Sequence, residues 1–569
     1  MEPTNRSASR MTRRAFGLNL LAGMALVGCG SIPTKGSVNH YADPAQSATP
    51  TQASLAAEGP TKDASPEEII RGFINAGIGA NDDYTVAREF LTGGFADSWK
   101  PDDSTLVHSA QISINQAAGK GKFTVNIPVT TSIDSRGLAT SFEEPDNKET
   151  SFSLIQVDGQ WRISDAPNGT ILERSDFEQI FTPFNLYFFD STFTYSVPDV
   201  RWFADRSTVA TSLTRVLLQG PAPYLENAVA SAVPAGTELG RNSVPVENGT
   251  AQVYLESAGG SQAPSQLDIE RLNVQLTQTL SHLNGVHTVQ LSLDNQNLDT
   301  GKLENFVEPQ INPSVGQHVI GLHGDQLVLR SDLMNESEDH PVYSGSESMQ
   351  HPAMGYKRQN FAFLNKEHTE VFWVNNEGKA VSVLQGPDVT APSFDQYQWL
   401  WASTHDGKIS VYSVATTATK TAENVSADWL KSYAVASLKI SRDGARALIV
   451  TLAGNRGSVW VSGIQRDAEN KPTQLTQPIR LGTTIDASDA HWYSDSSVLV
   501  ADYVTGKSQI VSLSGELTDI GALNGMMNVV SGSGNNSAIA QTTDSSVYLL
   551  VDYGWSRVDV QLQDVSYSG

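Results

Sequence analysis

The sequence contains a single cysteine, which excludes a disulfide framework, a cysteine-ligated zinc site and an iron–sulfur cluster. Positive charge is scarce too: 38 Lys and Arg residues face 62 Asp and Glu residues, for a net charge of −24. Because phosphate recognition needs a basic surface, we expect no nucleic-acid partner. No apolar run reaches the roughly 18 residues of a membrane-spanning helix. What remains is an acidic globular protein, whose 569 residues predict three or four domains.

Motifs that support catalysis or metal binding are also missing. The spacings Gly-x-Ser-x-Gly, Ser-x-x-Lys and His-Glu-x-x-His do not occur. The 11 histidines are scattered, and His282 and His287 span the end of a predicted helix, so they share no helical face. Asp294–Glu304 is rich in Asn and Asp but has Thr300 where a calcium loop needs Gly. We therefore expect no metal, no cofactor and no enzymatic activity.

One near-match and one alternative stay open. Gly506-Lys507-Ser508 resembles the end of a phosphate-binding loop, but Ala501 stands where the first Gly of that loop belongs, so we expect a simple turn. Paired carboxylates for glycoside cleavage are not excluded, because spacing in sequence does not fix distance in space.

The first thirty residues have the pattern of a secretory signal. Four arginines precede the apolar run Ala15–Val27, which is too short to span a membrane and suits a signal peptide. The run ends in Leu26-Val27-Gly28-Cys29, which resembles the lipobox of bacterial lipoproteins. This resemblance implies cleavage between Gly28 and Cys29, acyl chains such as palmitate on Cys29, and attachment to the extracytoplasmic face of the cell membrane. The Arg13-Arg14 pair also resembles a twin-arginine signal, so the export route stays open.

A tether and a first folded domain are predicted after this signal. Residues 29–64 are rich in Ser, Thr, Ala and Pro without apolar periodicity, which predicts a flexible tether. In residues 65–180, a capping box at Ser65–Glu68 begins one helix, and we expect a second helix over Asp82–Leu91. Alternating strands follow Gly121. Helices followed by a meander of strands resemble the cone-shaped α+β folds similar to nuclear transport factor 2 (NTF2-like folds).

Residues 181–297 are predicted to form a second α+β domain. Leu186–Asp190 favours a buried strand, and Ser265–Asp268 caps a long helix with one apolar stripe. This order, together with Leu217–Pro221 and Val233–Thr237, resembles the GerMN domain of Gram-positive sporulation and cell-envelope lipoproteins. No catalytic residues are established for that domain, so the resemblance implies none here.

Residues 310–569 are predicted to form an all-β propeller. Propeller blades repeat every ~40–50 residues, and the turns found here have a mean spacing of about 44 residues, which predicts six or seven blades. A pair of β-sandwiches is the alternative. The gap of 29 residues between Gly378 and Gly407 departs from the repeat. The turn positions are Gly324, Gly378, Gly407, Gly457, Gly506 and Ser545.

The order of these parts is more specific than any one of them. A lipobox, a tether, an NTF2-like domain, a GerMN-like domain and a propeller in this order resemble the actinobacterial LpqB lipoprotein family. The resemblance implies a partner, the extracellular domain of the MtrB sensor histidine kinase, and a role in two-component signalling through the MtrA response regulator, in cell-envelope homeostasis and division. The alternative from another class is an envelope glycan- or peptidoglycan-binding protein or hydrolase.

The lipobox gives the first testable prediction. Replacing the acceptor thiol in Cys29→Ser removes the only site for acylation, so the variant should become soluble or stay unprocessed. The measurement is membrane fractionation together with the intact mass of the protein. A variant that stays bound to membranes with the mass of the unmodified mature protein would contradict the assignment of the anchor.

Overall fold

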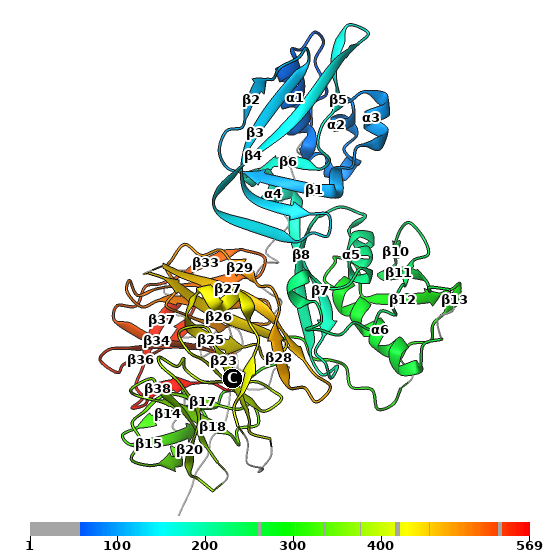
Figure 1. Cartoon of the computed structure of the whole chain (residues 1–569). Helices are drawn as coiled ribbons and strands as arrows, with labels where there is room; N and C mark the ends of the chain where they lie inside the picture. Colours follow the sequence, from blue (N-terminus) through cyan, green and yellow to red (C-terminus); the bar gives the residue numbers. More distant parts are fainter. Residues whose placement is uncertain are drawn as a thin grey trace, which may run out of the picture. The chain divides into compact units, whose positions relative to one another are not determined.

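The structure is a computed structural model that describes residues 57–569, except for 260–262, 302, 334–336, 376, 416–420, 455 and 533–536. The predicted signal peptide, Gly28, Cys29 and the tether up to residue 56 lie outside the described residues. Figure 1 follows the described chain from an N-terminal α+β domain through a second α+β domain to a propeller. The predicted fold class is confirmed.

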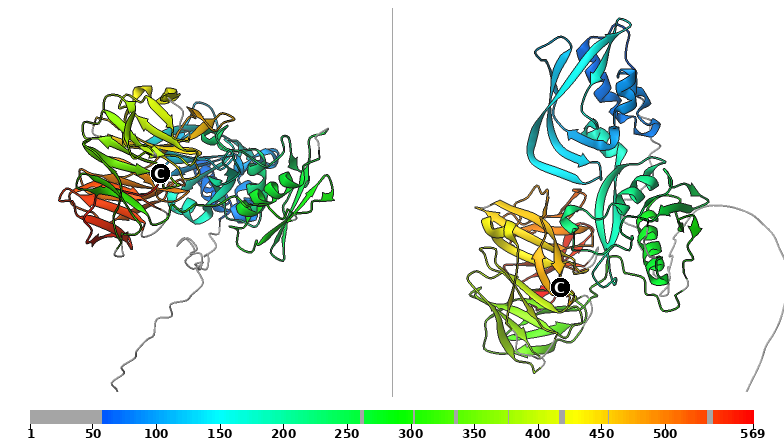
Figure 2. Two further views of the ribbon diagram at one scale, coloured as in Figure 1. Left: turned by 90° about the horizontal axis from the view of Figure 1, so that it is seen from below. Right: turned by 45° about the vertical axis from the view of Figure 1, so that its right-hand side comes forward.

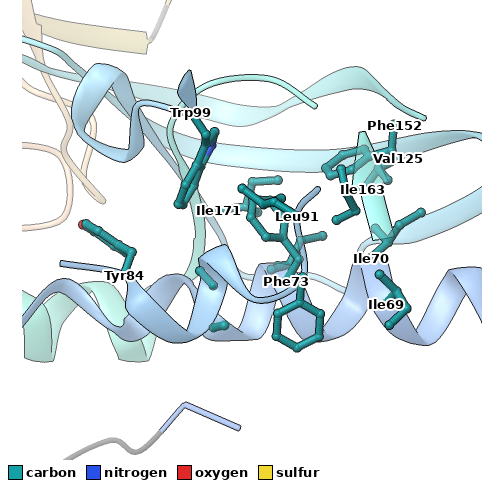
Figure 3. Packing of buried hydrophobic residues seen from close by; sticks show 14 of the residues in the cluster. Ile69, Ile70, Phe73, Tyr84, Leu91, Trp99, Val125, Phe152, Ile163 and Ile171 are labelled. Atoms are coloured by element: carbon teal, nitrogen blue, oxygen red, sulfur yellow. The ribbon is translucent and has the colours of Figure 1, made fainter. Parts of the chain in front are cut away.

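The N-terminal domain packs helices against a curved antiparallel sheet. The predicted capping box is present at α1: the Ser65 hydroxyl accepts from the Glu68 N–H, and the Glu68 carboxylate accepts from the Ser65 N–H. Apolar side chains of α1, including Ile70 and Phe73, are buried against Phe152 of the sheet (Figure 3). The helices are α1 (Pro66–Asn75), η1 (Ala76–Ile78), η2 (Ala80–Asp82), α2 (Thr85–Arg88), α3 (Gly93–Ser98), η3 (Pro101–Asp103) and α4 (Arg174–Ile180).

The sheet of this domain has the order β5-β4-β3-β1-β6, and β2 also pairs with β3. The strands are β1 (Ser104–His108), β2 (Ser113–Gln116), β3 (Lys122–Asp134), β4 (Ala139–Val157), β5 (Gln160–Asp165) and β6 (Thr170–Glu173). The helix predicted over Asp82–Leu91 is wrong in extent, since only α2 forms there. Asp83 and Tyr84 adopt the left-handed conformation, with φ of 56° and 57°, which a continuous right-handed helix does not allow.

The second domain consists of a β-hairpin, two helices and a small sheet. Hairpin strands β7 (Phe181–Phe189) and β8 (Ser196–Ala204) pair along their full length. Helix α6 begins at a capping box between Ser265 and Asp268, as predicted, and packs against β7 and β12. The other elements are α5 (Val209–Leu218), η4 (Pro223–Leu225), α6 (Gln266–Leu280), β9 (Glu238–Leu239), β10 (Val246–Glu247), β11 (Thr250–Glu256), β12 (Thr288–Leu293) and β13 (Gln296–Asn297).

The described residues after 318 form six sheets, the blades of a propeller (Figures 1 and 2, green through red). The last strand pairs with β14, so the C-terminal segment closes the first blade. The strands are β14 (Val319–His323), β15 (Gln326–Arg330), β16 (His340–Ser344), β17 (Met349–Met354), β18 (Phe361–Asn365), β19 (Glu370–Val374), β20 (Ala380–Gln385), β21 (Ser393–Phe394), β22 (Trp399–Ser403), β23 (Ile409–Ser413), β24 (Glu423–Val425), β25 (Ala434–Ile440), β26 (Arg446–Ala453), β27 (Arg456–Arg466), β28 (Pro472–Leu475), β29 (Ile479–Leu481), β30 (Asp489–Trp492), β31 (Ser497–Asp502), β32 (Lys507–Ser512), β33 (Leu517–Ile520), β34 (Met526–Ser531), β35 (Ala538–Thr542), β36 (Val547–Val551), β37 (Gly554–Val558) and β38 (Gln563–Ser566), with η5 (Asp428–Ser432) before β25.

Two of the predicted blade turns were assigned to the wrong residues. Gly378 connects the third and fourth strands of its blade, and the turn equivalent to the others lies at His368, with φ of 54°. Gly457 lies inside β27, and the turn before that strand contains Gly454. Glycine positions do not indicate this turn, because His368, a non-glycine residue, fills its left-handed position. This misassignment explains the irregular gap in the repeat.

An ion pair at the centre of β8 lies where the three parts of the chain meet. Asp199 and Arg201 are two residues apart, so both side chains leave the strand on the same face. Both are fully buried, and two hydrogen bonds of 2.8 Å join the guanidinium to the carboxylate. Burial alone would lower the pKa of Arg201, but the Asp199 carboxylate raises it above its ordinary value. Arg201 therefore stays charged.

This pair is bonded to the N-terminal domain. Arg201 Nη1 donates to the carbonyl of Arg136 (2.9 Å), and the N–H of Trp202 donates to the carbonyl of Gly137 (2.8 Å). Gly137 has φ of +77°, and a Cβ there would lie 2.7 Å from the Trp202 carbonyl oxygen, so the close approach requires glycine. The Trp202 ring packs on Phe177 of α4 with a centroid distance of 4.9 Å.

The same strand is bonded to the propeller through η4. Asp199 Oδ2 accepts from the N–H of Ala222 (2.7 Å), which fixes the start of η4. The carbonyl of Tyr224 in η4 then accepts from Thr476 Oγ1 of the propeller (2.5 Å), and Tyr224 belongs to one apolar cluster with propeller strands β26, β27 and β31. The Trp202 indole N–H donates to the carbonyl of Ser514 (3.1 Å). The described domains therefore form one structural unit.

We predict that Asp199→Asn lowers the free energy of unfolding by about 3–5 kcal/mol, because it leaves the Arg201 guanidinium buried without a counter-charge. The measurement is urea unfolding followed by tryptophan fluorescence. Glu178→Gln is the matched control: it breaks the exposed Arg174–Glu178 pair on α4 and should change the unfolding midpoint little. Equal midpoints for the two variants would contradict the role of the Asp199–Arg201 pair.

Candidate functional site

The residues predicted to carry the membrane anchor, Gly28 and Cys29, lie outside the part of the chain that the structure describes. Lipidation of Cys29 therefore stays a prediction. Across the described ranges, no helix combines the length and the apolar character needed to cross a membrane.

A cavity with a volume of about 360 Å³ lies inside the N-terminal domain. That volume falls within the ~300–1,000 Å³ range of small-molecule pockets. Phe73 of α1, Trp99 and Phe152 of β4 form one wall, with Phe73 in edge-to-face contact with Trp99 at a centroid distance of 5.1 Å. Leu106 and Ile171 add further apolar surface. The aromatic wall therefore offers a surface against which an apolar group of a ligand could pack.

The polar groups around this cavity hold the fold together and form no catalytic pair. Asp134 Oδ1 accepts from the N–H groups of Arg136 and Leu138, and Asp103 accepts from Asn168. Lys148 of β4 is exposed at the edge of the cavity. Because both carboxylates already serve as structural acceptors, the cavity offers a binding space without an obvious acid and base.

The residues that the sequence singled out as weak candidates have structural roles. The His282 ring stacks on Tyr187 at a centroid distance of 5.7 Å. Gly506 lies in the turn between β31 and β32 with φ of 69°, and a Cβ there would lie 2.4 Å from the Leu523 carbonyl oxygen, so the predicted turn is confirmed. Among the described residues, no group of three or more His, Cys, Asp and Glu side chains could hold a metal ion.

A short exposed segment between the second domain and the propeller is a candidate contact surface. Three apolar side chains, Leu303, Val307 and Ile311, are 40%, 78% and 41% exposed; we call residues 303–311 the connector. Gln310 holds the connector against β8, since its N–H donates to the Thr194 carbonyl and its carbonyl accepts from the Ser196 N–H (both 2.9 Å). Apolar side chains that gather on an exposed surface mark candidate sites for binding other proteins.

Sequence reasoning missed both the ion pair and the connector surface. One signal for the pair was present: Asp199 and Arg201 stand two apart in a strand that otherwise contains Val197, Val200 and Trp202. Two opposite charges on one face of an apolar strand indicate a buried pair. The connector had no such signal, because apolar residues in a loop indicate nothing until their exposure is known.

Comparison with family models covers most of the described chain. The model for the N-terminal domain of lipoprotein LpqB matches residues 59–178, and the model for the LpqB beta-propeller domain matches residues 332–565. Between them, a model described as sporulation and spore germination, the GerMN domain, matches residues 185–299.

Curated relatives agree with the family models. Lipoprotein LpqB of Thermobifida fusca is 24% identical over 567 residues, covering 88% of this chain and 90% of its own length. LpqB of Mycolicibacterium smegmatis is 25% identical, covering 84% and 85%, and LpqB of Bifidobacterium longum is 31% identical over 44% and 46%. Among solved structures, TolB of Acinetobacter baumannii aligns with 45% of this chain and 68% of its own at 10% identity and a TM-score of 0.34, which carries no functional argument. From the three matched domains and these relatives, the chain belongs to the LpqB lipoprotein family.

Proposed function

We propose that this protein is a lipid-anchored, extracytoplasmic lipoprotein without catalytic activity. On this proposal it binds the external domain of an MtrB-type sensor histidine kinase and thereby tunes signalling through the MtrA response regulator in cell-envelope homeostasis and division. Membership of the LpqB family is the observation that carries the proposal. The lipobox at Cys29 supports anchoring at the outer face of the membrane, where a kinase's sensor domain is within reach.

Anchoring strengthens the proposal on physical grounds. Two proteins held at one membrane surface meet at a raised effective concentration, so a weak contact is enough for regulation. A partner changes the activity of a two-state kinase only if it binds one arrangement better than the other. A difference of about 1.4 kcal/mol between the two affinities changes the ratio of the states tenfold.

The body of this protein suits such a role because its domains are bonded to one another. The Asp199–Arg201 pair and η4 connect the N-terminal domain, β8 and the propeller. A contact made by the connector would therefore be made by the whole body and not by a loose domain. The connector is the surface for which we propose binding to the kinase.

The hollow at the propeller axis does not support the alternative of a glycan hydrolase. The hollow found there has a volume of about 40 Å³, and no carboxylate side chain is among the described residues that line it. A sugar ring needs more space, and glycoside cleavage needs two carboxylates across the scissile bond.

The test is phosphorylation of MtrA in membranes that contain MtrB, with and without the lipoprotein. We predict that the unmodified lipoprotein changes the level of phosphorylated MtrA, and that Val307→Asp weakens binding to the kinase by about tenfold or more, because a charge replaces the most exposed apolar side chain of the connector. Val504→Asp is the matched control, since Val504 is 92% exposed on a propeller turn outside the connector. It should behave like the unmodified protein.

Two outcomes would contradict this account. Unchanged phosphorylation with and without the lipoprotein would remove the kinase role itself. Equal effects of Val307→Asp and Val504→Asp would keep the kinase role but move the contact away from the connector.

A further inference from the structure

The cavity of the N-terminal domain is apolar where it is buried. Phe73 packs edge to face on Trp99 and on Phe152, with centroid distances of 5.1 Å and 6.2 Å (Figure 3). Leu106 and Ile171, which are also buried, line the cavity with these rings. A lining made mainly of aromatic and aliphatic side chains is typical of pockets that bind small molecules. The buried part of the cavity therefore fits an apolar ligand.

Another part of the lining is polar and reaches solvent. Four polar side chains of β3 and β4 line the cavity: Ser132, Thr140, Lys148 and Thr150. Thr140 and Lys148 are exposed, and Ser132 and Thr150 are half-buried. Thr150 and Phe152 are two residues apart in β4, so both side chains leave the strand on the same face. One face of β4 therefore carries both polar and aromatic lining.

The charged side chains around the cavity are all exposed. Asp103, Asp134 and Lys148 line it, and every other lining residue is uncharged. The buried part of the cavity thus holds no side-chain charge that a ligand could neutralise. A ligand charge placed there would lose its hydration without gaining a counter-charge, which is strongly unfavourable. The part of a ligand that enters the cavity must therefore be uncharged.

Two hydroxyl groups of the lining are available to hydrogen-bond a ligand. Ser132 and Thr140 face each other in the antiparallel pair of β3 and β4, so their side chains lie on one face of the sheet. Within the described ranges, neither hydroxyl makes a hydrogen bond to another residue. The Thr150 hydroxyl, by contrast, already donates to the Val125 carbonyl (3.3 Å). A few polar groups in a mainly apolar pocket are what fixes the orientation of a bound molecule.

We propose that this cavity binds a small, uncharged and mainly apolar molecule that carries one hydroxyl or carbonyl group. Its apolar part packs against Phe73, Trp99 and Phe152, and its oxygen atom hydrogen-bonds to Ser132 or Thr140. A protein cavity of about 150 Å³ takes one benzene ring, so the volume of about 360 Å³ found here takes about two rings or an aliphatic chain of similar size. No residue of the connector lines the cavity, so this inference does not rest on the proposed contact with the kinase.

Prodan is the probe for the first test, since it is an uncharged naphthalene that carries a ketone. Its emission shifts to shorter wavelength in apolar surroundings. Titrated into the soluble Cys29→Ser protein without its signal peptide, prodan should show a saturable shift with a stoichiometry of one to one. Ser132→Phe places a ring in the cavity and removes no side-chain hydrogen bond to another described residue. It should weaken the binding of prodan by about tenfold or more.

Ser151→Phe is the matched control, because it adds the same ring to the same sheet outside the cavity. Ser151 is exposed, and successive residues of a strand point to opposite faces, so its side chain leaves β4 on the other face from Thr150 and Phe152. This variant should bind prodan as tightly as the protein with Ser151. Equal weakening in the two variants, or no saturable binding at all, would overturn the proposal.

A second measurement needs no variant of the cavity. A bromonaphthol is uncharged at neutral pH and combines two fused rings with one hydroxyl group. Crystals of the same soluble protein soaked in it should show anomalous density of bromine inside the cavity, next to Phe73, Trp99 or Phe152. Bromine at that position supports the site even if Ser132→Phe does not fold. Bromine at other positions only, or none, would overturn the proposal.

Discussion

The buried ion pair between Asp199 and Arg201 is the interaction on which the arrangement of the other parts depends. Its two charges lie on one face of β8, out of reach of water, and neither can lose its partner without leaving a bare charge in the interior. The remaining hydrogen-bonding groups of the pair reach the N-terminal domain at Arg136 and the start of η4 at Ala222. The hydrogen bonds of this one pair on β8 therefore orient both the N-terminal domain and η4.

This design affects how the protein can act on a partner. When domains are joined by free linkers, a partner that binds one domain has little effect on the others, because each domain moves independently. Here an apolar cluster formed by η4 and propeller strands, together with the bond from Trp202 to Ser514, keeps the second domain against the propeller. The connector is bonded to β8 as well. A partner that binds the connector would thus find its exposed apolar side chains already positioned, which lowers the entropic cost of association.

Local patterns were sufficient to predict most elements of the fold, and long-range contacts were not. The capping boxes at Ser65 and Ser265 depend on residues three apart, so the sequence displays them directly. The Trp202–Ser514 bond joins residues 312 positions apart, and nothing in a single sequence brings them together. His368 was missed differently, since its left-handed backbone carries no glycine to indicate it.

The central claim is that the folded body of this LpqB family member is itself the part that binds the kinase. The most direct measurement is calorimetric titration of the isolated external domain of MtrB with the soluble Cys29→Ser protein, freed of its signal peptide. The account predicts saturable binding with one defined stoichiometry, and a negative heat-capacity change from burial of the connector's apolar side chains. Millimolar protein in solution matches the effective concentration of two proteins held at one membrane surface. No detectable binding at that concentration would contradict the account.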